Sequence, residues 1–302
     1  MIEYDRFSWW RTTFSWKGTA LPLSFNRVFI ATMYCAAFEA IYQFGLYERW
    51  FVASGLEGLD PFAHTVLGSI IGFLLVFRIN ASSGRYWEGR SAWGQIINSS
   101  RNLVRVGAEY TNEGIELAGL TTGYAICLRR WLRGNRDTLE AELYLPPEVR
   151  EQAESFGNPP TAIAAAITAW ISKQRRFGTL DSQLIRMLEV PLASMVDAQG
   201  ACEKIQKTPL PYVYVAMIKQ LILVYLATLP LVLCPRLGWW SPLLMGVLSL
   251  AMLGLEEASV EIEDPFGTHA NCLDLEAYTL TIARDTGQLA DLASRRHQQH
   301  TV

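Results

Sequence analysis

The stretch FAHTVLGSIIGFLLVF, residues 62–77, decides the fold of this chain. It follows Pro61, contains no acidic or basic residue apart from a neutral His64, and ends at Arg78. As a helix it is about 24 Å long, slightly shorter than a hydrocarbon core of about 30 Å. The stretch therefore predicts a short membrane-spanning helix, around which the rest of the chain is organised.

The composition of the whole chain is that of a polytopic membrane protein. Half of the 302 residues are hydrophobic and 18% are charged, compared with about 25% charged residues in soluble domains. The apolar residues are concentrated in four blocks, which we interpret as membrane spans rather than as one large soluble core. The net charge of −3 gives no indication of a nucleic-acid partner.

The five cysteines are scattered, and none belongs to a CxxC pair. We interpret them as free, buried thiols and expect no metal site and no cofactor. The sequence also contains no GxSxG, P-loop, HExxH or GxGxxG pattern. We therefore expect that the protein is not an enzyme.

The positions of lysine and arginine predict how the chain crosses the membrane. The predicted spans are 28–47, 62–77, 212–233 and 239–255. The two short loops between them hold only Arg49 and Arg236, whereas the N-terminus and the region 78–211 are rich in arginine. Because basic residues favour the cytoplasmic side, we predict that both termini, region 78–211 and region 256–302 are cytoplasmic. The chain forms one unit over 1–302 in this interpretation.

The cytoplasmic region is predicted to be all α-helical. No strand alternation occurs, and helical spacing is found near 86–109, 115–132, 162–173 and 179–204. Pro147 and Pro159 follow loop residues and are typical of the first turn of a helix. The serine pairs at 82–83 and 99–100 are interpreted as turn or surface residues.

The stretch 62–77 has two faces as a helix. Gly68 and Gly72 are four residues apart, so a neighbouring backbone can approach closely on their side. The second face is an apolar stripe formed by Phe62, Val66, Ile70 and Leu74. In a ring of subunits such a stripe could line a constricted pore that gates by dewetting. The alternative is ordinary packing between helices, in a membrane-anchored assembly or sensor protein without a pore.

Ionisable residues within and after the spans provide further candidates. We interpret Lys219 as reaching from its span to the interface, and Glu39 as making an interhelical hydrogen bond or lining a conduction path. The acidic residues of 256–264 are expected to pair with arginines of 78–105. After Gly267, only Asn271 and Asp274 offer side-chain oxygens, which is too few for a calcium site of about six to eight ligands.

Three collinear stretches resemble the bacterial bestrophin homologues. They are FRINASSGRYWEGR (77–90), GACEKIQKTPLPY (200–212), and GLEE (254–257) together with DPFG (264–267). Bestrophins are pentameric ion channels with four membrane spans per subunit and a helical cytoplasmic vestibule. The resemblance implies a homopentamer in the inner membrane of a bacterium, with the lipid bilayer and small monovalent ions as its partners.

The resemblance also implies where the pore is narrow. The family has an apolar neck on the second span, which corresponds here to Phe62, Val66 and Ile70, or to Val66, Ile70 and Leu74. A second constriction at the cytoplasmic exit should fall in 180–185, with Leu184 or Leu180 as the candidate. Animal bestrophins bind calcium after ProPheGly, where this chain has ThrHisAlaAsnCys, so we expect currents that do not depend on calcium. Apolar rings leave the choice between anions and cations open, and the surplus of acidic residues favours cations.

Overall fold

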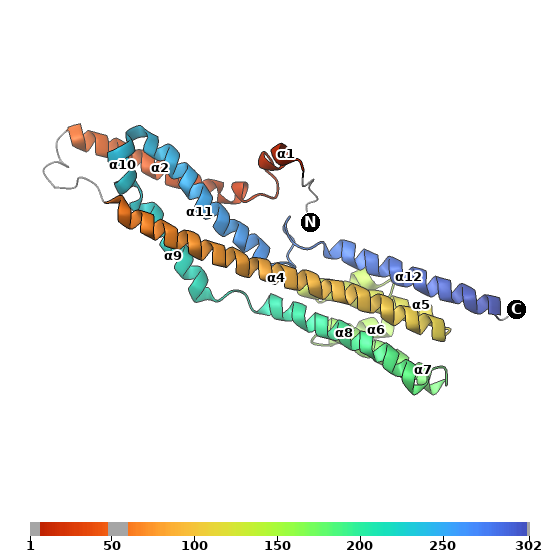
Figure 1. Cartoon of the computed structure of the whole chain (residues 1–302). Helices are drawn as coiled ribbons and strands as arrows, with labels where there is room; N and C mark the ends of the chain where they lie inside the picture. Colours follow the sequence, from red (N-terminus) through yellow and green to blue (C-terminus); the bar gives the residue numbers. More distant parts are fainter. Residues whose placement is uncertain (1–6, 48–59, 301–302) are drawn as a thin grey trace. The chain divides into compact units, whose positions relative to one another are not determined.

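A computed structural model describes residues 7–47 and 60–300, and these residues form helices without any strand. Figure 1 shows the chain. The helices are α1 Trp9–Thr13, α2 Ala20–Tyr47, α4 Pro61–Tyr110, α5 Gly114–Leu132, η1 Leu139–Ala141, α6 Pro147–Ser155, α7 Pro159–Arg176, α8 Ser182–Lys207, α9 Tyr212–Thr228, α10 Pro230–Leu237, η2 Gly238–Trp240, α11 Ser241–Glu263 and α12 Leu275–His300. The all-α fold is as predicted. Arg49, which entered the topology prediction, lies outside the described residues.

The helices form two compact units. Among the described residues, the first unit comprises 7–47, 60–86 and 209–264, and the second comprises 87–208 and 265–300. Helix α4 contributes its first half to the first unit and its second half to the second unit. The boundaries of the predicted polar helical region 78–211 lie close to those between the two units, at 86/87 and 208/209.

Three segments of the described chain are long and apolar enough to cross a membrane. They are Ala20–Gly45, Pro61–Tyr110 and Tyr212–Glu263. The third segment contains α9, α10, η2 and α11. The predicted span 212–233 is divided between α9 and α10, since Pro230 has no N–H to continue the hydrogen bonds of α9. The predicted span 239–255 begins in η2, and α11 continues beyond it to Glu263.

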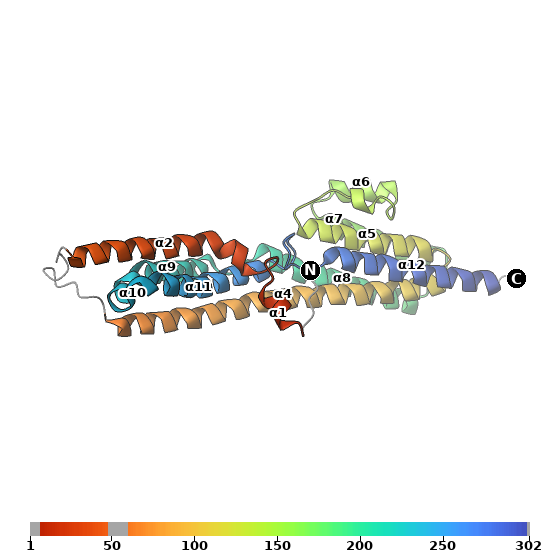
Figure 2. The same ribbon diagram turned by 90° about the horizontal axis from the view of Figure 1, so that it is seen from above.

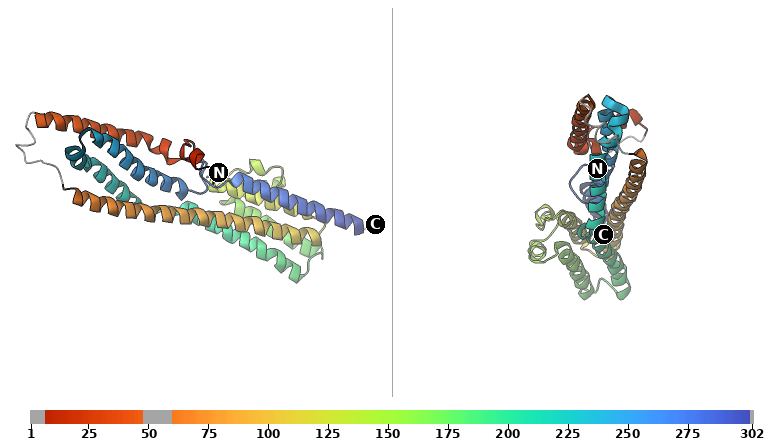
Figure 3. Two further views of the ribbon diagram at one scale, coloured as in Figure 1. Left: turned by 45° about the horizontal axis from the view of Figure 1, so that its top comes forward. Right: turned by 90° about the vertical axis from the view of Figure 1, so that its left-hand side faces the viewer.

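In the first unit, α2 lies along α11, as Figures 1 and 3 show. The two helices are close because Gly246 of α11 has no side chain: a Cβ atom there would lie 3.1 Å from the hydroxyl oxygen of Thr32. The core of this unit is apolar and includes Cys35, Ile71 and Met245, which are fully buried. The packing thus fixes α2 and α11 as a pair.

Helix α4 is unbroken over 50 residues. The expectation that the helix ends at Arg78 is wrong, and so is the interpretation of the serine pairs as turn or surface residues. Ser82 and Ser100 are fully buried within the helix, where small hydroxyl side chains fit against neighbouring elements. Arg78 is also buried, and an ion pair described below stabilises its charge.

The two glycines of α4 differ in their surroundings. A Cβ atom on Gly68 would lie 3.1 Å from the hydroxyl of Tyr225, so the close neighbour at this position is an aromatic side chain of α9 and not a backbone. Around the corresponding point on Gly72, no atom of the described residues lies within 4 Å, apart from its chain neighbours and the backbone of its own helix. Only one of the two positions therefore needs a glycine for close packing.

The second unit is a bundle in which α12 lies along α5, as Figure 2 shows, and α5 also packs on α7. The predicted helix 115–132 agrees with α5. Pro159 begins α7, and the side chain of Asn158 accepts a hydrogen bond from the N–H of Thr161 as the N-cap. All five cysteines are free and buried, as predicted. In this unit, burial raises the pKa of the Cys127 thiol to about 12, so this thiol is protonated at neutral pH.

Candidate pore-lining surface

The predicted neck residues differ in how much of each side chain is exposed in one subunit. Phe62, Val66 and Ile70 are 72%, 43% and 50% exposed. Leu74 is partly buried and packs against the core of the first unit. The first three residues are therefore available to line a pore, whereas Leu74 contributes to packing within the subunit.

Helix geometry explains why Leu74 differs from the other three. Each step of four residues advances about 40° around a helix of 3.6 residues per turn, so Leu74 points about 120° away from Phe62. A straight face needs a mixture of three- and four-residue steps with a mean of about 3.6, and such steps lead from Phe62 and Val66 to Ser69, Phe73 and Phe77. Phe73 and Phe77 are 63% and 52% exposed. Their rings pack edge to face, with centroids 4.6 Å apart.

The same mixture of three- and four-residue steps continues to the end of α4 through exposed positions. These are Asn80, Gly84, Trp87, Ser91, Gln95, Asn98, Asn102, Arg105 and Glu109. We call the whole set, from Phe62 to Glu109, the α4 face. Up to Phe77 it is apolar apart from Ser69, and beyond Phe77 it is mostly polar. Phe73 and Phe77 are not among the predicted neck residues, although their spacing in the sequence places them on this face.

In the second unit, the polar end of the α4 face borders α8. Asn102 and Arg105 line a cavity together with Arg186, Met187 and Val190 of α8. The two helices are joined by the hydroxyl groups of Ser99 and Ser194, which are 3.0 Å apart. This cavity is therefore polar on one wall and partly apolar on the other.

The two candidates for the exit constriction lie near the start of α8. Leu180 is only 4% exposed and belongs to the core of its unit, whereas Leu184 is half-buried. The side chain of Asp181 caps the helix by accepting hydrogen bonds from the N–H groups of Gln183 and Leu184 at 2.9 and 2.8 Å. The cap fixes where α8 begins and hence where Leu184 is placed.

In the first unit, one buried carboxylate forms ion pairs with three basic side chains. Glu256 is 2% exposed, and its Oε1 lies 3.1 Å from Nη1 of Arg78, which is itself buried. The same oxygen lies 3.4 Å from Nζ of Lys219, and Oε2 lies 3.6 Å from Nη1 of Arg27. Arg27 also pairs with Glu257. The expected pairing of the acidic run with the arginine-rich stretch is thus present between Glu256 and Arg78.

Glu39 is fully buried in the first unit and is not part of the α4 face. Its Oε1 accepts a hydrogen bond of 2.6 Å from the amide of Gln43. Gln43 lies one turn further along α2, so this hydrogen bond lies within one helix. The sequence prediction for Glu39 was a hydrogen bond between helices or a place in a conduction path. Oε2 of Glu39 has no hydrogen-bond partner among the described residues.

Comparison with known families provides the assignment of the chain. A model described as "Bacterial/Fungal Bestrophin protein" matches residues 1–288. The chain belongs to this family. The resemblance found in the three sequence stretches is therefore confirmed.

Curated relatives of this bestrophin-family chain are similar over almost their whole length. The voltage-dependent anion channel-forming protein alr2987 of Nostoc sp. is 31% identical over 298 residues, which cover 94% of this chain and 92% of the relative. The voltage-dependent anion channel-forming protein YneE of Escherichia coli is 30% identical over 297 residues, with coverages of 97% and 95%.

Solved structures of a bacterial bestrophin homologue from Klebsiella pneumoniae have the same fold. One of them is 25% identical, has a TM-score of 0.81, and covers 88% of this chain and 98% of that one. A form of the homologue with one substitution has a TM-score of 0.82 at 25% identity and covers 91% and 100%. The bestrophin fold therefore applies to nearly the whole chain.

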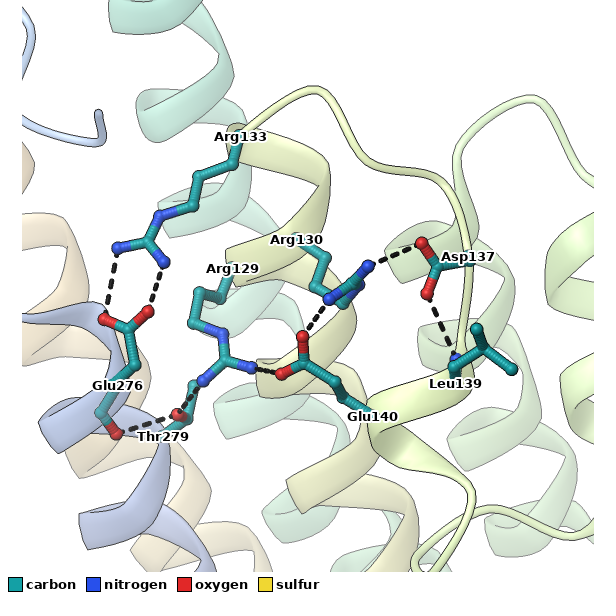
Figure 4. A network of polar contacts seen from close by, with 8 residues as sticks. All are labelled: Arg129, Arg130, Arg133, Asp137, Leu139, Glu140, Glu276 and Thr279. Carbon is teal, nitrogen blue, oxygen red and sulfur yellow. Dashed lines mark hydrogen bonds and ion pairs between the residues drawn. The ribbon is translucent and has the colours of Figure 1, made fainter. Parts of the chain in front are cut away.

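In this bestrophin-family chain, arginines at the end of α5 bind residues of α12 and η1, as Figure 4 shows. Nε of Arg133 donates to the carbonyl oxygen of Phe266 at 3.4 Å, and its guanidinium pairs with Glu276 at the start of α12. Arg129 and Arg130 in the last turn of α5 both bind Glu140 of η1. The Arg133 guanidinium holds the pKa of the Glu276 carboxyl below its ordinary value, and Glu276 raises the pKa of Arg133.

Of the two oxygen ligands considered for calcium, Asp274 has a role at the start of α12. Oδ1 of Asp274 accepts a hydrogen bond of 2.9 Å from the N–H of Ala277, so it stabilises the first turn of α12. Within 7–47 and 60–300, no group of three or more His, Cys, Asp or Glu side chains is placed to hold a metal ion. The ring of Phe266, in the segment before α12, is buried against Gly89 of α4. A Cβ atom on Gly89 would lie 3.0 Å from this ring.

Proposed function

We propose that this chain is the subunit of a homopentameric ion channel in the bacterial inner membrane, which passes small monovalent ions through one central pore. The observation that carries the proposal is the α4 face. It is a straight face that changes from apolar to polar along a single helix, and its side chains are exposed in the isolated subunit. Five such faces around an axis enclose a path with a dry entrance and a wet continuation.

The neck in this proposal is formed by Phe62, Val66, Phe73 and Phe77, with Ile70 at the margin of the face. Rings of apolar side chains gate by dewetting and require no bound ligand. The exposed fractions favour the alternative that begins at Phe62 over the one that ends at Leu74. For the cytoplasmic constriction we propose Leu184, since Leu180 belongs to the core.

The topology in this proposal has four crossings, by α2, α4, α9 and α11. The last two belong to one apolar segment that turns at α10. Both termini and the second unit are then cytoplasmic, in agreement with the distribution of arginine. The family assignment favours a channel over an enzyme.

Planar bilayers containing the purified protein test the function. We expect single-channel currents, and the reversal potential under a gradient of potassium chloride then gives the selectivity. The names of the curated relatives favour anions, whereas the acidic surplus of the sequence favours cations. An intact ring that gives no current would contradict the proposal and favour the assembly or sensor protein without a pore.

A further inference from the structure

The first unit has an apolar groove between α2 and α9. Ile30 and Tyr34 of α2 form one wall, and Leu223 and Ala227 of α9 form the other. The floor is α11, which contributes Met245 and Leu253. Ile30 and Leu223 are 66% and 69% exposed, so the groove is open along its length.

The groove lies within segments that can cross a membrane. Its walls belong to Ala20–Gly45 and Tyr212–Glu263, two of the three apolar segments. Hydrocarbon chains, and not water, surround such segments in a bilayer. The chemistry of the lining therefore fits an acyl chain.

One end of the groove is positively charged. Arg27 and Lys219 line this end with side chains that are 44% and 54% exposed. Both contact the same buried carboxylate, Glu256, so the two cations are held near each other. One phosphate group can therefore reach both.

The charges at this end do not cancel. The network holds the cations Arg27, Arg78 and Lys219 against the carboxylates Glu256 and Glu257, which leaves one positive charge. Arg78 and Glu256 neutralise each other in the interior, so the surplus belongs to the two exposed cations. The opposite end is closed by the hydroxyl of Tyr34, which donates to the carbonyl oxygen of Ala227 at 2.9 Å.

We propose that this groove binds one anionic phospholipid. The phosphate is bound by Arg27 and Lys219, and an acyl chain lies against Ile30, Leu223 and Ala227. A helix of a second subunit is the competing occupant. Such a helix would have to cover Arg27 and Lys219, which together carry one positive charge without a counterion. The binding does not depend on whether the protein conducts ions.

Native mass spectrometry of the full-length, delipidated protein tests the proposal. Phosphatidylglycerol is compared with phosphatidylcholine of the same acyl chains. We expect wild-type protein to retain phosphatidylglycerol preferentially. The variant Arg27→Gln/Lys219→Gln should lose about 5-fold in affinity for each cation removed.

Two controls separate the groove from general charge effects. Arg296→Gln/Lys204→Gln removes an arginine and a lysine of similar exposure, 51% and 62%, from the second unit, and should leave the lipid preference unchanged. Ala227→Trp fills the groove without a change of charge and should reduce binding of both lipids.

The proposal fails if wild-type protein binds the two lipids equally, or if the preference survives in the Arg27→Gln/Lys219→Gln variant. It also fails if Ala227→Trp binds phosphatidylglycerol as the wild type does, because the phosphate would then be bound elsewhere. Loss of the ring in Ala227→Trp without any lipid bound to the wild type would assign the groove to a second subunit.

Discussion

Glu256 joins three positively charged side chains that come from three different helices. Its closest partner, Arg78, is as deeply buried as Glu256 itself. Removing one member of a buried ion pair leaves the other charge without compensation, which costs more than the pair contributes when it is intact. The stability of the first unit therefore depends strongly on this one carboxylate.

The substitution Glu256→Gln should destabilise the protein by about 3–5 kcal/mol, because the buried Arg78 loses its counterion. The matched control is Glu257→Gln, which removes the neighbouring carboxylate and breaks the pair with the half-exposed Arg27. We expect the control to cost less than about 1 kcal/mol. Thermal unfolding in detergent measures both, and equal losses would contradict the special role of Glu256.

The register of the neck can be tested with two adjacent residues of α4. If the α4 face lines a pore, Phe73→Ala widens the neck and raises the single-channel conductance. Leu74→Ala removes a side chain that packs on the core, and should lower stability by about 2 kcal/mol without raising the conductance. The opposite result, a larger current for Leu74→Ala only, would restore the register Val66, Ile70 and Leu74.

The start of α12 is held by charges, and its stability should depend on pH. Arg133 lowers the pKa of Glu276 below the ordinary value of 4.5. The ion pair therefore contributes fully above this value, and its contribution is lost as the pH falls through the lower pKa of the folded state. Because Glu276 is half-exposed, we expect a contribution of less than about 1 kcal/mol.

Thermal unfolding in detergent at a series of acidic pH values measures this contribution. The variant Glu276→Gln should show a smaller decrease of the melting temperature toward low pH than the wild type. Glu148→Gln is the control, because Glu148 is exposed and forms no ion pair among the residues that the structure describes. An identical pH dependence of all three proteins would exclude a contribution from Glu276.

The N-cap of α12 provides a test of calcium dependence. We expect currents that are the same with calcium and with a chelator. Asp274→Ala should cost about 0.5–2 kcal/mol of stability through loss of the cap, and Asp274→Asn should retain most of it. A calcium-dependent current that Asp274→Ala abolishes would show that Asp274 is a ligand.

The helices could be predicted where the pattern of apolar residues is unambiguous. Region 115–132 agrees with α5, and Asn158 with Pro159 marks the start of α7 as expected. The predicted helical stretch 86–109 lies within α4, but its connection to 62–77 without a break was not predicted. The sequence alone does not show that Arg78 and Ser82 are buried. Their burial depends on partners such as Glu256, which is distant in the sequence.

The choice of pore-lining residues stays a prediction, and helix geometry changes which residues of α4 share one face. A strict four-residue stripe was assumed, and it turns gradually around the helix. The burial of Leu74 and the exposure of Phe73 and Phe77 reveal the straight face. Their exposure depends on contacts between helices that are distant in the sequence, and the apolar pattern of α4 alone does not contain this information.

The complete assembly is the subject of the last prediction. A single α4 face cannot enclose a path, so the channel needs a closed ring of subunits. We expect a particle of about five times the chain mass of 34.0 kDa, measured in detergent by light scattering or native mass spectrometry. A stable monomer or dimer would contradict the channel.

The pair between Arg78 and Glu256 has a consequence for biosynthesis. These residues are 178 positions apart in the sequence, and a ribosome adds about 5–20 residues per second. Arg78 is therefore made roughly 10–40 seconds before its carboxylate, and Arg27 and Lys219 also precede it. During this interval the newly made first half of α4 has an arginine without its counterion. Chains that terminate before residue 256 should accordingly be degraded, even though their helices are long and apolar enough to cross a membrane.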